Sequence, residues 1–149
     1  LLKAITVAAR GESNPQMNPR LRSFILKAKE YNVPNENILR AIHRSALGKE
    51  LEEVIIEAYG PEKTAFIVEC ITDNKNRTIA EIKNILVKEG AKFAESGSVR
   101  WNFEPPTTGG SWRAKSIHGI SPEGITKIAS LIQALESHDD VQKITTNSN

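Results

Sequence analysis

One stretch of the sequence, residues 59–86, reads YGPEKTAFIVECITDNKNRTIAEIKNIL. Residues 64–71 are rich in β-branched and aromatic side chains, as a buried strand should be. From Ile79 to Leu86 the apolar residues instead recur at helical spacing. The stretch therefore predicts a strand, a polar loop over residues 72–78 and a helix that follows directly.

The polar loop has two interpretations. Thr78 and Glu81 have the spacing of a capping box, which predicts that the helix begins at this threonine. Lys75 and Arg77 lie beside that start, where the helix dipole is already positive, and with the neighbouring asparagines they could hold an anion. Short loops rich in Asn and Lys are also common as plain solvated turns, which is the other interpretation.

Charge is distributed unevenly along the chain, which has 149 residues, 39% of them hydrophobic, and a formal net charge of +2. Residues 1–49 hold nine Lys or Arg against three Asp or Glu, whereas residues 50–104 hold seven against eleven. This excess of cations suggests nucleic acid or another acidic partner for the N-terminal third. The apolar content suffices for a core but not for a membrane span, so we expect a soluble globular protein with no membrane partner.

Cysteine and methionine usage bears on the compartment and on the N-terminus. Cys70 is the only cysteine, so it cannot form an internal disulfide, and this favours a reducing compartment. The sequence opens on Leu1 in what reads as the middle of a helix, and its only methionine is Met17. We therefore expect the natural N-terminus, with any targeting peptide, to lie upstream.

The N-terminal residues predict a basic bundle of three short helices. Asn18 and Pro19 supply a capping residue and a proline in the first position of the second helix. Asn35 is predicted to cap the third helix, and Gly48 to end it. At 100° per residue the basic side chains of these helices fall away from the apolar positions, where they form either a binding face or ordinary solubilising charge.

The following residues predict an α+β domain, a small mixed or antiparallel sheet with two covering helices. The predicted strands span residues 54–59, 64–71, 99–103 and 141–145, and the second helix spans residues 125–135. The alternation of Val99, Trp101 and Phe103 defines the third strand and predicts a core position for Trp101.

The chain therefore divides into three parts. We assign residues 1–49 to the basic helical domain, residues 50–104 together with 122–149 to the α+β domain, and residues 105–121 to a linker. The linker is rich in Pro, Thr, Gly and Ser and shows little apolar periodicity.

Residues with catalytic or metal-binding chemistry do not gather in the sequence. His43, His118 and His138 are scattered over three predicted elements and, with Cys70, lack the spacing of metal ligands. Serine-elbow, zinc-protease and cysteine-nucleophile patterns are absent as well. We therefore predict a protein that is not an enzyme and uses no metal or cofactor.

The order of motifs along the chain resembles a known family. The matching segments include ITVAAR at residues 5–10, NPRLR at 18–22, KAK at 27–29, RAI at 40–42, YGP at 59–61, VEC at 68–70, TDNKNRT at 72–78, GSV at 97–99 and DDVQ at 139–142. They look like the YebC/PmpR family, whose mitochondrial members are translational activators of cytochrome c oxidase. The resemblance covers nearly the whole chain except residues 105–121.

The resemblance implies a helical N-terminal domain, an α+β second domain and a third domain inserted into the second. Carried over by position, the residues expected to face nucleic acid are Arg10, Arg20, Arg22, Lys27, Lys29, Arg40 and Arg44, with Asn74, Lys75, Asn76 and Arg77 as a second contact. The resemblance also places the turn of Tyr59, Gly60 and Pro61 near the partner.

The resemblance leaves more than one function open. Members of the family have been called DNA-binding transcriptional regulators, and they are also implicated as ribosome-associated factors that assist the synthesis of difficult stretches. Our leading hypothesis is a ribosome-associated translational activator that binds ribosomal RNA through the basic helical domain. The alternative is a transcriptional regulator that binds duplex DNA, although no helix-turn-helix spacing marks a recognition helix. A third hypothesis is a protein-interaction scaffold that uses the acidic second domain. We expect a monomer in the mitochondrial matrix or the bacterial cytoplasm.

The chain departs from the family pattern at three places. Glu62 and Lys63 stand where the family usually has two glycines, which puts a close approach of this loop to an RNA backbone in doubt. The family's basic extension, which would precede Leu1, is not in the sequence. The inserted third domain has been either left out of this sequence or lost, because the 18 residues from Glu104 to Ser121 cannot enclose an independent core.

Overall fold

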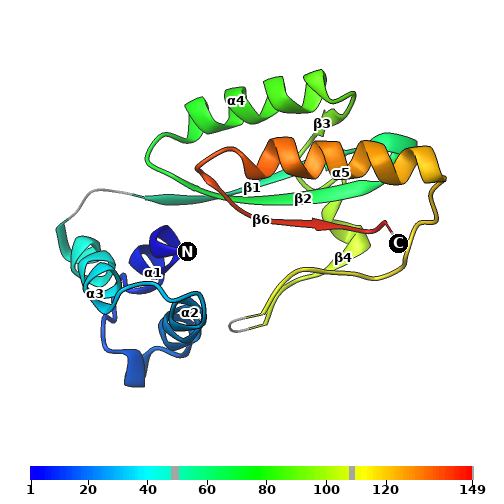
Figure 1. The fold of residues 1–149 in the computed structure, drawn as a ribbon. Helices are drawn as coiled ribbons and strands as arrows, with labels where there is room; N and C mark the ends of the chain where they lie inside the picture. The colour runs from blue at the N-terminus through cyan, green and yellow to red at the C-terminus, as the bar shows by residue number, and fades with distance from the viewer. Residues whose placement is uncertain (48–50, 108–109, 149) are drawn as a thin grey trace.

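The structure is a computed structural model that describes residues 1–47, 51–107 and 110–148. Two predictions fall outside these ranges, namely the end of the third helix at Gly48 and the domain boundary between residues 49 and 50. Figure 1 shows a group of helices at one end of the molecule and a sheet with two long helices at the other. The described residues therefore confirm the predicted α+β class.

The N-terminal part consists of three helices. They are α1 (Leu2–Ala8), α2 (Pro19–Glu30) and α3 (Asn35–Arg44), with 3₁₀ turns at Pro15–Met17 and Ser45–Leu47. α1 packs against both α2 and α3. Ile5, Leu21 and Ile38, one from each helix, are at most 2% exposed. This small core fixes which faces of α2 and α3 remain on the surface.

The start of α2 confirms the prediction, and the start of α3 does not. Asn18 Oδ1 accepts a hydrogen bond from the Leu21 N–H at 3.0 Å, and Pro19 is the first helical residue. The predicted cap at Asn35 is wrong, because Pro34 is the residue that precedes α3. Asn35 is already helical, and proline has no side-chain group that could accept a hydrogen bond, so α3 begins without a side-chain cap.

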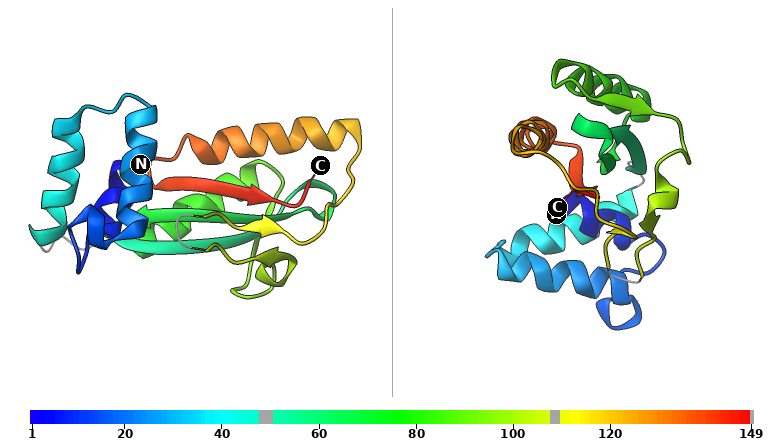
Figure 2. Two further views of the ribbon diagram at one scale, coloured as in Figure 1. Left: turned by 90° about the horizontal axis from the view of Figure 1, so that it is seen from below. Right: turned by 90° about the vertical axis from the view of Figure 1, so that its right-hand side faces the viewer.

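Four antiparallel strands form the sheet, in the order β3, β1, β2, β6. These strands are β1 (Glu52–Tyr59), β2 (Ala65–Thr72), β3 (Lys92–Ala94) and β6 (Val141–Thr146). The helices α4 (Lys75–Lys88) and α5 (Pro122–Glu136) lie on one face of this sheet (Figures 1 and 2). The predicted hairpin, the two covering helices and the last strand are thus confirmed.

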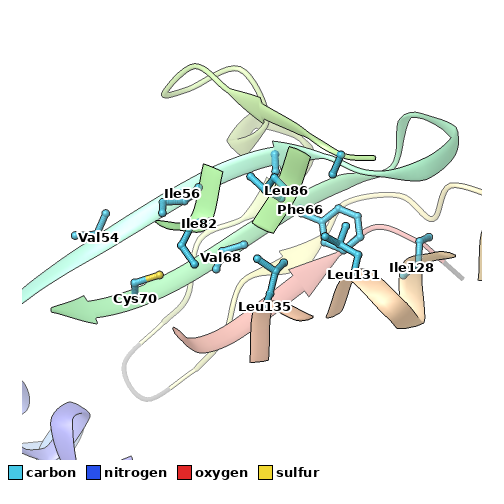
Figure 3. Close-up of a cluster of buried hydrophobic side chains, with 12 residues drawn as sticks. Val54, Ile56, Phe66, Val68, Cys70, Ile82, Leu86, Ile128, Leu131 and Leu135 are labelled. Atoms are coloured by element: carbon cyan, nitrogen blue, oxygen red, sulfur yellow. The ribbon is translucent and has the colours of Figure 1, made fainter. Parts of the chain in front are cut away.

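The main core lies between the sheet and these two helices. Its buried side chains include Val54, Ile56, Phe66, Val68, Cys70, Ile82, Leu86, Ile128, Leu131 and Leu135 (Figure 3). Cys70 packs here as an apolar side chain, and burial raises the pKa of its thiol to about 12. The thiol is therefore protonated at neutral pH and is not a nucleophile.

The opposite face of the sheet is covered by a small hairpin. Its strands are β4 (Phe103–Glu104) and β5 (Arg113–Ala114), which pair antiparallel. Phe103 packs with Ala65 and Ile67 of β2, and Trp112 is half-buried against the same cluster. The central strand β2 is therefore buried on both faces, and part of the segment predicted as a linker forms a strand.

The predicted strand over residues 99–103 is wrong, because most of this segment forms a 3₁₀ turn. Val99 is buried, but Trp101 is 67% exposed instead of lying in the core. The carboxylate of Glu57 causes the turn, since it accepts hydrogen bonds from the Val99 and Arg100 N–H groups, both at 2.9 Å. The remaining strand of the sheet is β3, whose three residues are too few to show a pattern in the sequence.

Leu131 of α5 is fully buried, and we expect Leu131→Ala to lower the free energy of unfolding by about 2–5 kcal/mol. The loss combines apolar area returned to water with the cavity left behind. Urea denaturation followed by circular dichroism measures it. Val87→Ala on α4 is the matched control, because Val87 is 74% exposed. Equal losses in the two variants would contradict the described core.

Candidate nucleic-acid interface

The basic residues of the helical domain lie mainly on its surface. The exposed ones are Arg10, Arg22, Lys27, Lys29, Arg40 and Arg44. Among the described residues, Arg10, Lys27, Lys29, Arg40 and Arg44 make no ion pair within 4.0 Å, and Arg22 donates to the carbonyls of Pro15 and Gln16 at 3.3 and 3.4 Å. These charges are therefore available to an acidic partner.

Arg20 differs from the other cations of this set. Its guanidinium pairs with the carboxylate of Glu53, at the start of β1, and lies 5.7 Å from the centre of the Phe24 ring. Arg20 is only partly exposed and stands where the helical domain meets the sheet. Because Glu53 already neutralises its charge, Arg20 is less available to a phosphate than the exposed cations of the helical domain.

The structure brings the cations together in pairs rather than at one point. Lys27 and Lys29 share the last turn of α2, where the negative end of the helix dipole stabilises them. Arg40 and Arg44 stand on successive turns of α3. In Figure 2 the two helices run in opposite directions, so the two lysines lie toward the end of the domain where α3 begins. The result is an extended basic surface, the kind that follows a phosphate backbone.

The predicted capping box at the start of α4 is wrong. Asn74 is the capping residue, and its Oδ1 accepts from the Arg77 N–H at 3.1 Å. Lys75, Asn76 and Arg77 therefore form the first turn of α4 and not a loop. Thr78 is buried, and its hydroxyl donates to Asp140 Oδ2 at 2.8 Å. The cap therefore lies four residues before the predicted one, and this distant carboxylate takes the hydroxyl that the prediction used as a cap.

Arg77 already has anions from within the protein. Its Nη2 lies 3.0 Å from Asp140 Oδ2 and 3.3 Å from Asp73 Oδ1, and its Nε lies 3.7 Å from Glu81 Oε1. These carboxylates supply the relief that an external anion was expected to provide. Lys75 and Asn76 remain exposed, so the structure separates Arg77 from the other residues of the predicted second contact.

Asp140 is a buried carboxylate that joins three elements. It is 4% exposed and lies just before β6, and Lys3 of α1 donates to its Oδ1 at 2.7 Å. Burial by itself would raise the pKa of Asp140, but hydrogen bonds from Lys3 and Thr78 and the charges of Lys3 and Arg77 outweigh it, and the pKa lies below its usual value. Asp140 therefore joins α1, α4 and the edge strand, a role that its spacing in the sequence does not reveal.

A second buried carboxylate, that of Glu57, holds the turn that displays Trp101. Glu57 is 2% exposed and accepts hydrogen bonds from the N–H groups of Gly97, Val99 and Arg100 and from Arg100 Nε at 3.0 Å. Burial would raise the pKa of Glu57, yet these donors hold the pKa below its usual value. A glutamate among the apolar residues 54–59 of the strand was the available signal in the sequence.

The turn predicted to lie near a partner is built around Gly60. A Cβ at this position would collide with the ring of Phe66, so only glycine fits. Tyr59 is partly buried, and its hydroxyl donates to the Ser98 carbonyl at 3.2 Å. Pro61 follows as the first residue of a 3₁₀ turn.

The side chains that replace the family's glycines adopt the conformation that glycine favours. Glu62 and Lys63 have φ values of 54° and 63°, in the left-handed region. The Glu62 carboxylate reaches the start of α5, where it accepts from the Ser121 hydroxyl and from the Ser121 N–H at 3.0 Å. These two hydrogen bonds lower the pKa of Glu62. The acidic side chain is therefore bound to the protein.

The described residues offer no site for metal chemistry, since no three His, Cys, Asp or Glu side chains gather in a metal-binding arrangement among them. Helices long and apolar enough to cross a membrane are likewise not found in the part of the chain that the structure describes.

Comparisons with known proteins identify a family and relatives that this chain resembles. The family model for the TACO1/YebC protein N-terminal domain matches residues 1–48, and that for the TACO1/YebC second and third domain matches residues 51–108. A probable transcriptional regulatory protein of Persephonella marina is 51% identical over 108 residues, and one of Desulfotalea psychrophila is 48% identical. Both alignments cover 70% of this chain and 43% of the relative.

A solved structure resembles the whole fold. The crystal structure of a conserved hypothetical protein from Aquifex aeolicus superposes with a TM-score of 0.89 at 30% identity, covering 99% of this chain and 87% of that one. The bacterial relatives are named as probable transcriptional regulatory proteins, and the family models define the class of protein by its domains. The chain belongs to the TACO1/YebC family. It spans less than half the length of the bacterial relatives that it matches.

Asp140→Asn should lower the free energy of unfolding at pH 7 by about 1–3 kcal/mol, because the charged hydrogen bonds to Lys3, Arg77 and Thr78 are weakened. The exposed neighbour provides the control, Asp139→Asn, which should change stability little. Thermal and urea denaturation of both variants measure the difference.

The pH dependence of that difference has a definite sign. The folded-state pKa of Asp140 lies below its unfolded value, so the stabilisation is present at neutral pH and is lost as the pH falls through the folded-state pKa. Wild type and Asp140→Asn should therefore converge in acid, below about pH 4. A difference that stays constant from pH 7 to pH 2 would show that the charge of Asp140 is not its source.

Proposed function

We propose that this chain is a transcriptional regulator that binds duplex DNA through its N-terminal helical domain. The observation that carries the proposal is the set of exposed cations on α2 and α3, which have no carboxylate within ion-pair distance among the described residues. The names of the bacterial relatives, probable transcriptional regulatory proteins, support the same function. Because the chain covers only part of these relatives, the activity of the whole protein is part of the proposal.

The connection between α2 and α3 gives this proposal a geometry. Residues 31–34 join the two helices, and Asn32 in this connection adopts a φ of 58°. This short connection lets α3 run back beside α2 in the opposite direction (Figure 2). In that arrangement Arg40 and Arg44 of α3 and the lysines of α2 would contact the phosphate backbone, which positions a protein on duplex DNA.

A second candidate function follows from the resemblance of the motifs to the YebC/PmpR family. That resemblance implies a ribosome-associated factor that assists translation, and the same cations would suit ribosomal RNA. In this case the protein would be a ribosome-associated translational activator. For both candidates we propose a monomer acting in the cytoplasm of a bacterium, by analogy with the relatives.

Fluorescence anisotropy with duplex DNA selected from a random library tests the proposal. We expect a preferred duplex sequence, and affinity that falls steeply with salt concentration. Lys29→Glu combined with Arg40→Glu should weaken DNA binding at least tenfold. The double variant should also reduce the slope of log binding constant against log salt concentration, by about 0.9 for each phosphate that is no longer neutralised. Lys88→Glu combined with Lys127→Glu, two exposed residues of α4 and α5, is the charge-matched control.

Competition separates the two candidates. A transcriptional regulator should keep its preferred duplex in the presence of ribosomal RNA. Salt-sensitive cosedimentation with ribosomes, together with the absence of any preferred duplex sequence, would favour the translational activator. Binding that the double reversal on α2 and α3 leaves unchanged would contradict both, because both use that surface.

A further inference from the structure

The sheet has an edge that β3 covers only in part. β1 runs from Glu52 to Tyr59, but β3 pairs only with residues 57–59. The Gly60 N–H donates to the Thr64 carbonyl in the turn that joins β1 to β2. Counting back from this pair, alternate residues of β1 direct their backbone groups toward β2, and the others direct theirs toward β3.

The uncovered backbone groups belong to two residues. By this alternation, the backbone groups that point toward the β3 side are those of Glu53, Ile55, Glu57 and Tyr59. β3 pairs with the last two of these residues. Glu53 and Ile55 face an edge at which no strand pairs among the described residues. β1 pairs with β2 in unbroken register along its whole length, so it presents this edge without a bulge or a proline.

A groove of about 360 Å³ runs along this uncovered edge. One wall comes from the helix-bearing face of the sheet, with Lys75 and Ile79 of α4 and Phe93 of β3. The other wall comes from the opposite face, with Ser96 and Arg100 of the turn that Glu57 holds in place. The groove therefore has walls on both faces of the sheet, with the edge of β1 between them, as the position of a further strand would require.

The charges of the groove indicate what enters it. Glu57 is paired with Arg100, and Glu53 is paired with Arg20 of the helical domain. Lys75 has no ion pair within 4.0 Å among the described residues and stands in the first turn of α4, where the helix dipole adds positive charge. Arg20, from outside the groove, and Arg100 thus neutralise the two groove-lining glutamates, and Lys75 is left as the groove-lining charge without an ion-pair partner among the described residues.

We propose that this edge binds an extended segment of a partner protein, which adds to β1 as a continuation of β3 and places an acidic side chain beside Lys75. Backbone hydrogen bonds to Glu53 and Ile55 would supply affinity, and the side chains of the two walls would supply selectivity. An apolar side chain of the segment would pack against Ile79 and Phe93. The site lies on the sheet, apart from the basic surface of α2 and α3.

Selection from a random library of twelve-residue peptides displayed on phage, with the full chain as bait, provides the probe. We expect enriched peptides that alternate β-branched residues with polar ones and contain an acid. A selected peptide, made synthetically, should shift the amide resonances of Glu53 and Ile55 and slow their hydrogen exchange. Absence of enrichment, or shifts confined to other amides, would overturn the proposal.

Three variants make the test specific. Lys75→Glu should lower the affinity for the selected peptide at least tenfold. The substitution should not disturb the first turn of α4, because an acidic side chain is favourable at a helix N-terminus. Lys88→Glu at the other end of α4 should leave binding unchanged. Lys29→Glu with Arg40→Glu should also leave it unchanged, and loss of peptide binding in that variant would mean that the peptide binds the basic surface instead.

Ile55→Pro tests the backbone contact directly. It removes an N–H that the pairing of β1 with β2 does not use, and circular dichroism shows whether the variant folds. The folded variant should lose peptide binding, whereas retained affinity would overturn strand addition. Sedimentation of wild type should show no concentration-dependent association. Self-association that Ile55→Pro abolishes would identify a second copy of this chain as the occupant, which contradicts the proposed partner.

Discussion

One buried carboxylate determines how the helical domain meets the sheet. Asp140 receives Lys3 from α1 and both Arg77 and Thr78 from α4, at distances of 2.7 to 3.0 Å. A carboxylate without partners would be costly to bury, so the donors must arrive together, and this fixes α1 against the start of β6. The apolar residues at the same seam, Ala4, Val7, Leu51 and Ile71, make contacts that do not depend on direction. The charged contact supplies the orientation that they do not.

The same contact explains where the sequence was sufficient and where it was not. Periodicity within one segment predicted the hairpin of β1 and β2, the helices α4 and α5, and β6, because each buries one regular set of side chains. The start of α4 and the turn at residues 99–103 were mispredicted, because residues far away in the chain decide them. Asp140 takes the Thr78 hydroxyl, and Glu57 takes amides of the turn. Neither partner follows from local spacing.

For the candidate interface, the sequence likewise predicted which cations lie on the surface but not which of them are paired. Helical angles alone placed Lys29 and Arg40 on the surface, where the structure has them. Whether a cation is free or paired is a tertiary property, and Arg20 and Arg77 are both held by carboxylates of other elements. The protein thus presents two chemically different surfaces. The basic helices suit a charged polymer, whereas the sheet edge offers directional hydrogen bonds to an extended backbone.

The turn between β1 and β2 ties together two positions that are distant in the chain. The carboxylate of Glu62 lies where the Cβ of a side chain at position 124 of α5 would stand, so such a side chain would have to push this flexible carboxylate away from Ser121. If position 62 becomes glycine, that space opens, and α5 can accept alanine, a better helix former, at position 124. Substitutions at the two positions should therefore covary among relatives. Some should have an acidic residue at position 62 with glycine at position 124, and others should have glycine at position 62 with a larger residue at position 124.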